Sequence, residues 1–182
     1  LEQTPFEISQ PVKWEFPNGL TVLYMQDREV PVIGGTLFFR GGSYFDPPEL
    51  VGLAKATGSL LREGSIQGMS PAEFDRQLDA LGASIESAFK DEDGSISFSC
   101  LEEDFQSVIR LFRGVVRNPG FDSSRLALWK KLSTRSIQKR RDSSETMAKM
   151  AFEELVYGPG SAYGRYSDID SVERITRSDI LK

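Results

Sequence analysis

Segments with the pattern of β-strands occur in adjacent pairs in this chain, and this order restricts the fold more than any other feature. Two β-type runs flank Pro17-Asn18-Gly19, and Asn-Gly between such runs is a strong hairpin signal. Three further strands are predicted over 31–40, 83–90 and 95–101, the last two joined by a short polar turn. Strands joined by short turns pair antiparallel, so we predict a mostly antiparallel sheet rather than βαβ units.

Helix-type patterns fill the stretches between and after these strands. Apolar residues recur at spacings of three and four over about 49–62, and Ser70-Pro71-Ala72-Glu73 is typical of a capping box that starts a second helix. Three more helices are predicted over about 102–117, 123–141 and from Asp142 onward. The last carries an apolar stripe that we predict to be core: Met147, Met150, Ala151, Phe152, Leu155 and Val156. The predicted fold class is α+β, with a mostly antiparallel sheet and helices packed on one face.

Two glycines, Gly52 and Gly58, lie inside the predicted helix over 49–62. Each costs about 1 kcal/mol relative to alanine, so a glycine in such a place usually has a packing reason.

The chain of 182 residues contains no histidine. This excludes Ser-His-Asp and Cys-His catalysis within the chain, and every zinc or iron site with histidine ligands. The single cysteine, Cys100, lies in an alternating apolar run, and we expect it to be a buried strand residue. Carboxylate chemistry, Lys or Tyr chemistry, or no chemistry at all remain open.

The charge balance is mildly acidic, with 22 Lys and Arg against 27 Asp and Glu and a net charge of −5. Nucleic-acid binding requires a basic excess, so we do not expect it. The one local basic excess, over 130–141, is interpreted as the polar face of a helix. No apolar run is long enough for a transmembrane helix. Residues 1–11 lack the pattern of a signal peptide and are interpreted as an extension before a domain over 12–182.

From Phe16 to Ser65 the sequence resembles the N-terminal domain of the M16 family of pitrilysin, insulinase and mitochondrial processing peptidase. The matching features are the Asn-Gly-Leu hairpin, the strand end at Arg40-Gly41-Gly42-Ser43 and the helix that follows. Further matches are LDALGASIES, NPGFDSSRL and YGPGSAYGRYSDIDSVERITRSDI, which extend the resemblance to about Ile180. The resemblance implies the LuxS/MPP-like metallohydrolase fold.

A last cap signal, Thr176-Arg177-Ser178-Asp179, stands three residues before the final residue. We therefore interpret the chain as a fragment of a longer protein with two or more domains.

In active M16 members a helix carries the motif H-x-x-E-H, whose two histidines bind zinc and whose glutamate is the general base. A glutamate on a later helix is the third ligand, and another glutamate on that helix supports it. On this chain the motif falls on Lys55-Ala56-Thr57-Gly58-Ser59, and the two later positions are Ser136 and Trp129. A cation, a residue without a side chain and hydroxyl groups are poor zinc ligands. The resemblance therefore implies no zinc, no other cofactor and no peptidase activity for this chain alone.

M16 proteins close two halves into a clamshell, and commonly one half carries zinc and the other does not. The resemblance implies a non-catalytic subunit that completes the chamber, binds an extended peptide or protein substrate, and forms a hetero- or homo-oligomer with an H-x-x-E-H chain. Strand addition to a sheet edge is the expected mode. The candidate edge is 83–90, with Ser84, Glu86, Ser87 and Ala88. An ion pair between Lys55 and Glu86 is a further hypothesis.

Two alternative functions stay open. The first is a zinc peptidase whose active site lies beyond residue 182. The second is a purely structural subunit, because core proteins of respiratory complexes resemble the M16 family. Family habit suggests a bacterial periplasmic or secreted location, while substrate, partner and compartment do not follow from the residues.

Overall fold

The computed structural model describes residues 10–182, so the predicted extension over 1–11 lies almost wholly outside the described residues. The chain divides into two compact units, the first ending at Pro31. In this unit β1 (Val12–Glu15) pairs antiparallel with β2 (Thr21–Tyr24). The turn between them closes on a hydrogen bond from the Phe16 N–H to the Leu20 carbonyl. The predicted Asn-Gly hairpin is confirmed.

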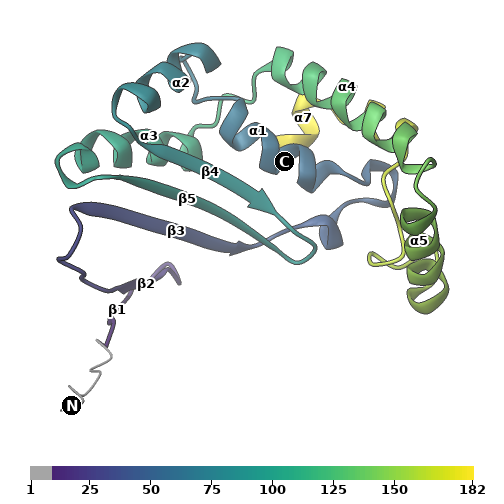
Figure 1. Cartoon of the computed structure of the whole chain (residues 1–182), viewed down its shortest axis with the longest axis horizontal. Coiled ribbons are helices and arrows are strands. Elements are labelled where there is room, and N and C mark those ends of the chain that lie inside the picture. Colours follow the sequence, from purple (N-terminus) through teal and green to yellow (C-terminus); the bar gives the residue numbers. More distant parts are fainter. Residues whose placement is uncertain (1–9) are drawn as a thin grey trace, which may run out of the picture. The chain divides into compact units, whose positions relative to one another are not determined.

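The second unit contains a three-stranded antiparallel sheet. Its strands are β3 (Val32–Arg40), β4 (Ser84–Phe89) and β5 (Asp93–Leu101), in the order β3-β5-β4. The helices that pack on the sheet lie on one side of it (Figure 1). Both observations confirm the predicted α+β class with an antiparallel sheet and helices on one face.

The helices follow the predicted order. They are α1 (Leu53–Glu63), α2 (Pro71–Ala80), α3 (Phe105–Arg117), α4 (Ser123–Arg140) and α5 (Ser144–Tyr157), then the short α6 (Ile169–Arg174) and α7 (Arg177–Ile180). The 3-10 turns Ser43–Phe45 and Pro48–Leu50 lie between β3 and α1, and the turn Glu102–Asp104 lies between β5 and α3. Among the described residues no helix combines the length and apolar character needed to cross a membrane.

The first helix starts later than the apolar pattern predicts. Gly52 has a left-handed backbone with φ of 108°, which separates the 3-10 turn at 48–50 from α1. Only glycine adopts this conformation without strain. Helix α1 therefore begins at Leu53 rather than near Glu49.

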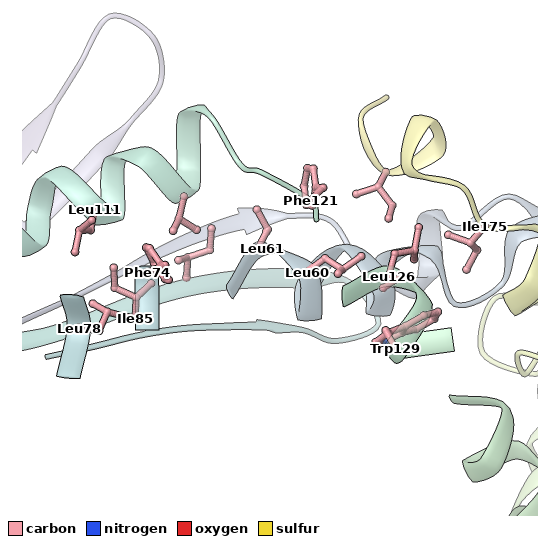
Figure 2. Packing of buried hydrophobic residues seen from close by; sticks show 14 of the residues in the cluster. Leu60, Leu61, Phe74, Leu78, Ile85, Leu111, Phe121, Leu126, Trp129 and Ile175 are labelled. Atoms are coloured by element: carbon pink, nitrogen blue, oxygen red, sulfur yellow. The ribbon is translucent and has the colours of Figure 1, made fainter. Parts of the chain in front are cut away.

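A single core joins the inner face of the sheet to α1, α2, α3 and α4. Buried side chains from these elements meet in one cluster, with Phe74, Leu78 and Ile85 at one end and Leu60, Leu126 and Trp129 at the other (Figure 2). Cys100 is buried in β5, as predicted.

The prediction for α5 is wrong. None of its residues is buried, and Phe152 and Leu155 are 65% and 84% exposed. Met147, Ala151 and Val156 are exposed as well. The apolar stripe is present as predicted, but no element of the described chain packs over it.

Candidate functional site

Helix α1 is the candidate site, because the resemblance places the M16 motif on this helix. Helix α1 packs on β4 and also contacts α4. Its first turn is held by Asp46, whose carboxylate accepts hydrogen bonds from the N–H groups of Gly52 (2.7 Å) and Ala54 (2.8 Å). These are backbone donors that a helix start leaves without partners. A buried carboxylate therefore sets where α1 begins.

Arg165, in the loop that follows α5, binds the segment that precedes α1. Its guanidinium donates hydrogen bonds to the backbone carbonyls of Ser43, Tyr44 and Asp46. Burial raises the pKa of Asp46 above its usual 3.8, against the opposing effects of the two N–H donors and of the nearby charge of Arg165.

Gly58, which the resemblance predicts to stand at the position of the catalytic glutamate, faces β4 at very close range. A β-carbon built at residue 58 would lie 2.7 Å from Cδ2 and 3.1 Å from Cβ of Phe89. The Phe89 ring cannot move freely, because it packs edge-on against Phe39 at 5.2 Å between ring centres. The hydroxyl of Ser87 donates to the Gly58 carbonyl at 2.5 Å. The space of a general base is thus filled by β4.

The other four positions that the resemblance assigns to the zinc site differ in their exposure to solvent. Lys55 is exposed on the outer side of α1, and Ser59 is half-buried. Ser136 is exposed on α4, whereas Trp129 is only 7% exposed and packs in the core (Figure 2). Helix α4 therefore presents an indole, not a carboxylate, toward α1.

The hypothesis of an ion pair between Lys55 and Glu86 has no support in the structure. Both residues are exposed, and Glu86 lies on β4, whose even-numbered side chains point away from the helices. Among the described ion pairs, none involves either residue.

The residues of this site do not fit a zinc ion. Nowhere in residues 10–182 do three His, Cys, Asp or Glu side chains come close enough together to hold a metal. Zinc in proteins draws its ligands from these residue types. At the two motif positions that the resemblance assigns to ligands stand Lys55 and Ser59, and at the predicted base position Gly58 has no side chain and Phe89 occupies the space beside it.

The edge of the sheet next to α1 is formed by β4, which has β5 as its neighbour on one side only. Ser84, Glu86 and Ala88 pair with Ser99, Ser97 and Ser95. The hydrogen bond from the Lys90 N–H to the Asp93 carbonyl places these pairs in the hydrogen-bonded register. The backbone groups of the alternate residues, Ile85, Ser87 and Phe89, therefore point to the open edge.

Those edge groups have no backbone partner elsewhere in the described part of the chain. An edge with free N–H and C=O groups is a template for another strand.

The sequence analysis missed Phe89 as a site residue. The available signal was Gly58 itself, an interior helix glycine that needed a packing reason. Its partner could not be named, because contact between residues 31 positions apart depends on how β4 crosses α1.

Comparison with known proteins identifies the family. The model of the insulinase family, peptidase family M16, matches residues 21–160. The chain belongs to peptidase family M16. A search of curated protein sequences finds no significant match.

Solved structures show the same fold. The inactive domain of an M16 peptidase from Pseudomonas fluorescens superposes with a TM-score of 0.87 at 24% identity, over 94% of this chain and 42% of that one. The periplasmic protease PqqL from Escherichia coli gives 0.83 at 10%, over 99% and 20%. The ferredoxin protease FusC, solved with Arabidopsis ferredoxin, gives 0.79 at 15%, over 94% and 19%. This M16 chain therefore spans less than half the length of these relatives.

Proposed function

We propose that this M16 domain is a non-catalytic part of a peptidase assembly. It completes a clamshell chamber with an H-x-x-E-H partner chain and holds an extended peptide at the edge of β4. The observation that carries the proposal is the contact between Gly58 and Phe89. It leaves no room for a general base on α1, while the neighbouring strand edge stays open.

Peptide binding by strand addition suits the chemistry of this edge. An incoming strand would exchange main-chain hydrogen bonds with Ile85, Ser87 and Phe89. Such bonds carry no side-chain requirement, so the edge would accept many sequences and present them to a partner's active site.

The first test replaces Ser87 with proline in the assembled complex. Proline removes the Ser87 N–H, which points to the open edge, and leaves the pairs of Ser84, Glu86 and Ala88 with β5 in place. We expect the affinity for an unstructured peptide to fall about tenfold, measured by fluorescence anisotropy.

The matched control is Ser87→Ala. This variant loses the hydroxyl bond to the Gly58 carbonyl but keeps the N–H. We expect it to bind peptide like the wild type. Unchanged affinity in Ser87→Pro would rule out strand addition at β4.

The exposed apolar face of α5 supports a partner in this assembly. We define it by Met147, Ala151, Phe152, Leu155 and Val156, all of which face solvent. A large exposed apolar patch marks a protein contact. We assign the α5 face to the H-x-x-E-H partner.

The second test is Phe152→Glu with Leu155→Glu. Because both side chains are exposed, we expect the unfolding midpoint to change little, while co-purification with the partner is lost. Gln106→Glu, exposed on α3, serves as the control and should leave the complex intact. Full retention of the complex in the double variant would show that the partner does not bind at α5.

A further inference from the structure

Helix α4 carries an exposed stripe of its own, in addition to the α5 face. This stripe lies on the side of α4 opposite its contact with α1. Leu126 and Trp129 point into the core, as one face of α4. Residues spaced by three and four along the other face are all exposed, and we call them the α4 outer stripe: Leu128, Lys131, Leu132, Arg135 and Lys139. It combines two apolar side chains, 42% and 54% exposed, with three cations.

The cations of the stripe lack counter-charges. Among the described ion pairs, none involves Lys131, Arg135 or Lys139. Residues 130–141 hold no acidic residue, although the chain as a whole has a net charge of −5. Three of the six cations in 130–141 therefore lie together on this exposed face of α4.

A hollow of about 450 Å³ adjoins the stripe. Lys130, Lys131, Arg135 and Thr134 line it, together with Ala127 and Glu173. The Oγ1 atom of Thr134 is buried and has no hydrogen-bond partner in the described chain. Lys130 donates to the Glu173 carbonyl at 2.5 Å, which holds its ammonium group at the rim. The same ammonium lies 4.0 Å from the Glu173 carboxylate, so Lys130 is already paired. The hydroxyl of Thr134 and the cations of Lys131 and Arg135 are the groups that match a carboxylate.

We propose that the α4 outer stripe binds an acidic amphipathic segment of a partner protein. Leu128 and Leu132 would contact the apolar residues of that segment. Its carboxylates would face Lys131, Arg135 and Lys139, and one would enter the hollow against Thr134. This surface is separate from β4 and from the α5 face, so it does not depend on the proposed function.

A second copy of this chain is a poor occupant for the stripe. In a two-fold contact the same patch meets itself, which would set Lys131 and Arg135 of one copy against those of the other. Cations placed next to one another in such a contact would repel. Complementary charge therefore favours an acidic partner over self-association.

The test uses a fluorescent 14-residue helical peptide with leucines at i and i+4 and glutamates beside them, and a second peptide with glutamine in place of glutamate. We expect the acidic peptide to bind at least about tenfold more tightly, and added salt to weaken it. Equal binding of the two peptides would overturn the proposal.

Variants locate the site. Lys131→Glu with Arg135→Glu should weaken the acidic peptide by about tenfold or more, whereas Arg113→Glu on α3 should stay within about twofold. Thr134→Val should weaken binding and Thr134→Ser should preserve it. Unchanged binding in the double variant would overturn the assignment.

Vesicles of phosphatidylglycerol distinguish a lipid partner. If they bind with the same dependence on Lys131 and Arg135 while the acidic peptide does not bind, the proposal of a protein partner is wrong. If the peptide binds and the vesicles do not, the proposal is supported.

Discussion

Replacing Gly58 with alanine should lower the free energy of unfolding by about 2 kcal/mol, although alanine is the better helix former. On propensity alone the change would stabilise α1 by about 1 kcal/mol. The new β-carbon, however, would lie 2.7 Å from the Phe89 ring, and Phe39 limits how far that ring can move. Urea unfolding curves for the two proteins measure the difference.

Two controls separate packing from propensity. Gly160→Ala lies in a loop where an added β-carbon meets nothing within 4 Å, and it should change stability by less than about 0.5 kcal/mol. In the background of Phe89→Ala, the cost of Gly58→Ala should fall, because the contact with the ring is gone and only the one with Cβ at 3.1 Å remains. A stabilising effect of Gly58→Ala in the otherwise unchanged protein would show that Phe89 on β4 moves aside at little cost.

The same contact predicts that restoring the family motif fails. In the variant Lys55→His, Gly58→Glu and Ser59→His, a glutamate side chain would have to displace Phe89 from its place beside α1. The third-ligand position still holds Ser136, and Trp129 still fills the core. We expect a loss of about 4 kcal/mol or more and no tight zinc in an equimolar titration. One tightly bound zinc ion would refute this.

Removing the Asp46 carboxylate at the start of α1 should also lower the free energy of unfolding strongly. Asp46→Ala leaves the N–H groups of Gly52 and Ala54 buried without acceptors, and takes away the charge that faces Arg165. We expect a loss of about 3 kcal/mol in free energy of unfolding at pH 7. Glu49→Ala, exposed in the preceding turn, should cost less than about 0.5 kcal/mol. Equal effects of the two substitutions would show that Asp46 is not a cap.

The pH dependence of this difference follows from the direction of the Asp46 pKa shift. Burial raises the pKa of Asp46 above 3.8, so the folded protein holds the proton more tightly than the unfolded chain. This contribution to stability is full below pH 3.8 and is lost as the pH rises through the raised pKa. Asp46→Ala lacks the group. The variant should therefore show a smaller decline in stability than the wild type over that range, as measured by thermal unfolding at a series of pH values.

The local sequence pattern was sufficient to predict the helices, the strands and the class of fold. The Asn-Gly hairpin, the alternation in β5 and the capping residues of α2 act over a few neighbouring residues, and each predicted element is present. The prediction of no zinc also needs no structure, because it depends on residue types at the positions that the M16 resemblance assigns to the motif. Lys55 and Ser59 are poor zinc ligands, and Gly58 carries no carboxylate, wherever α1 lies.

Tertiary structure decided what those residues contact. The apolar stripe of α5 has the spacing of a core helix, yet burial depends on whether another element covers it, and none in the described chain does. Likewise, the need for glycine at residue 58 follows from the position of Phe89, and one edge of β4 is open because β4 pairs with β5 alone. Sequence by itself predicted that α1 lacks zinc ligands at the positions that the M16 resemblance assigns to the motif. Only the packing of β4 on α1 decided that the vacated place is filled, because such contacts join residues far apart along the chain.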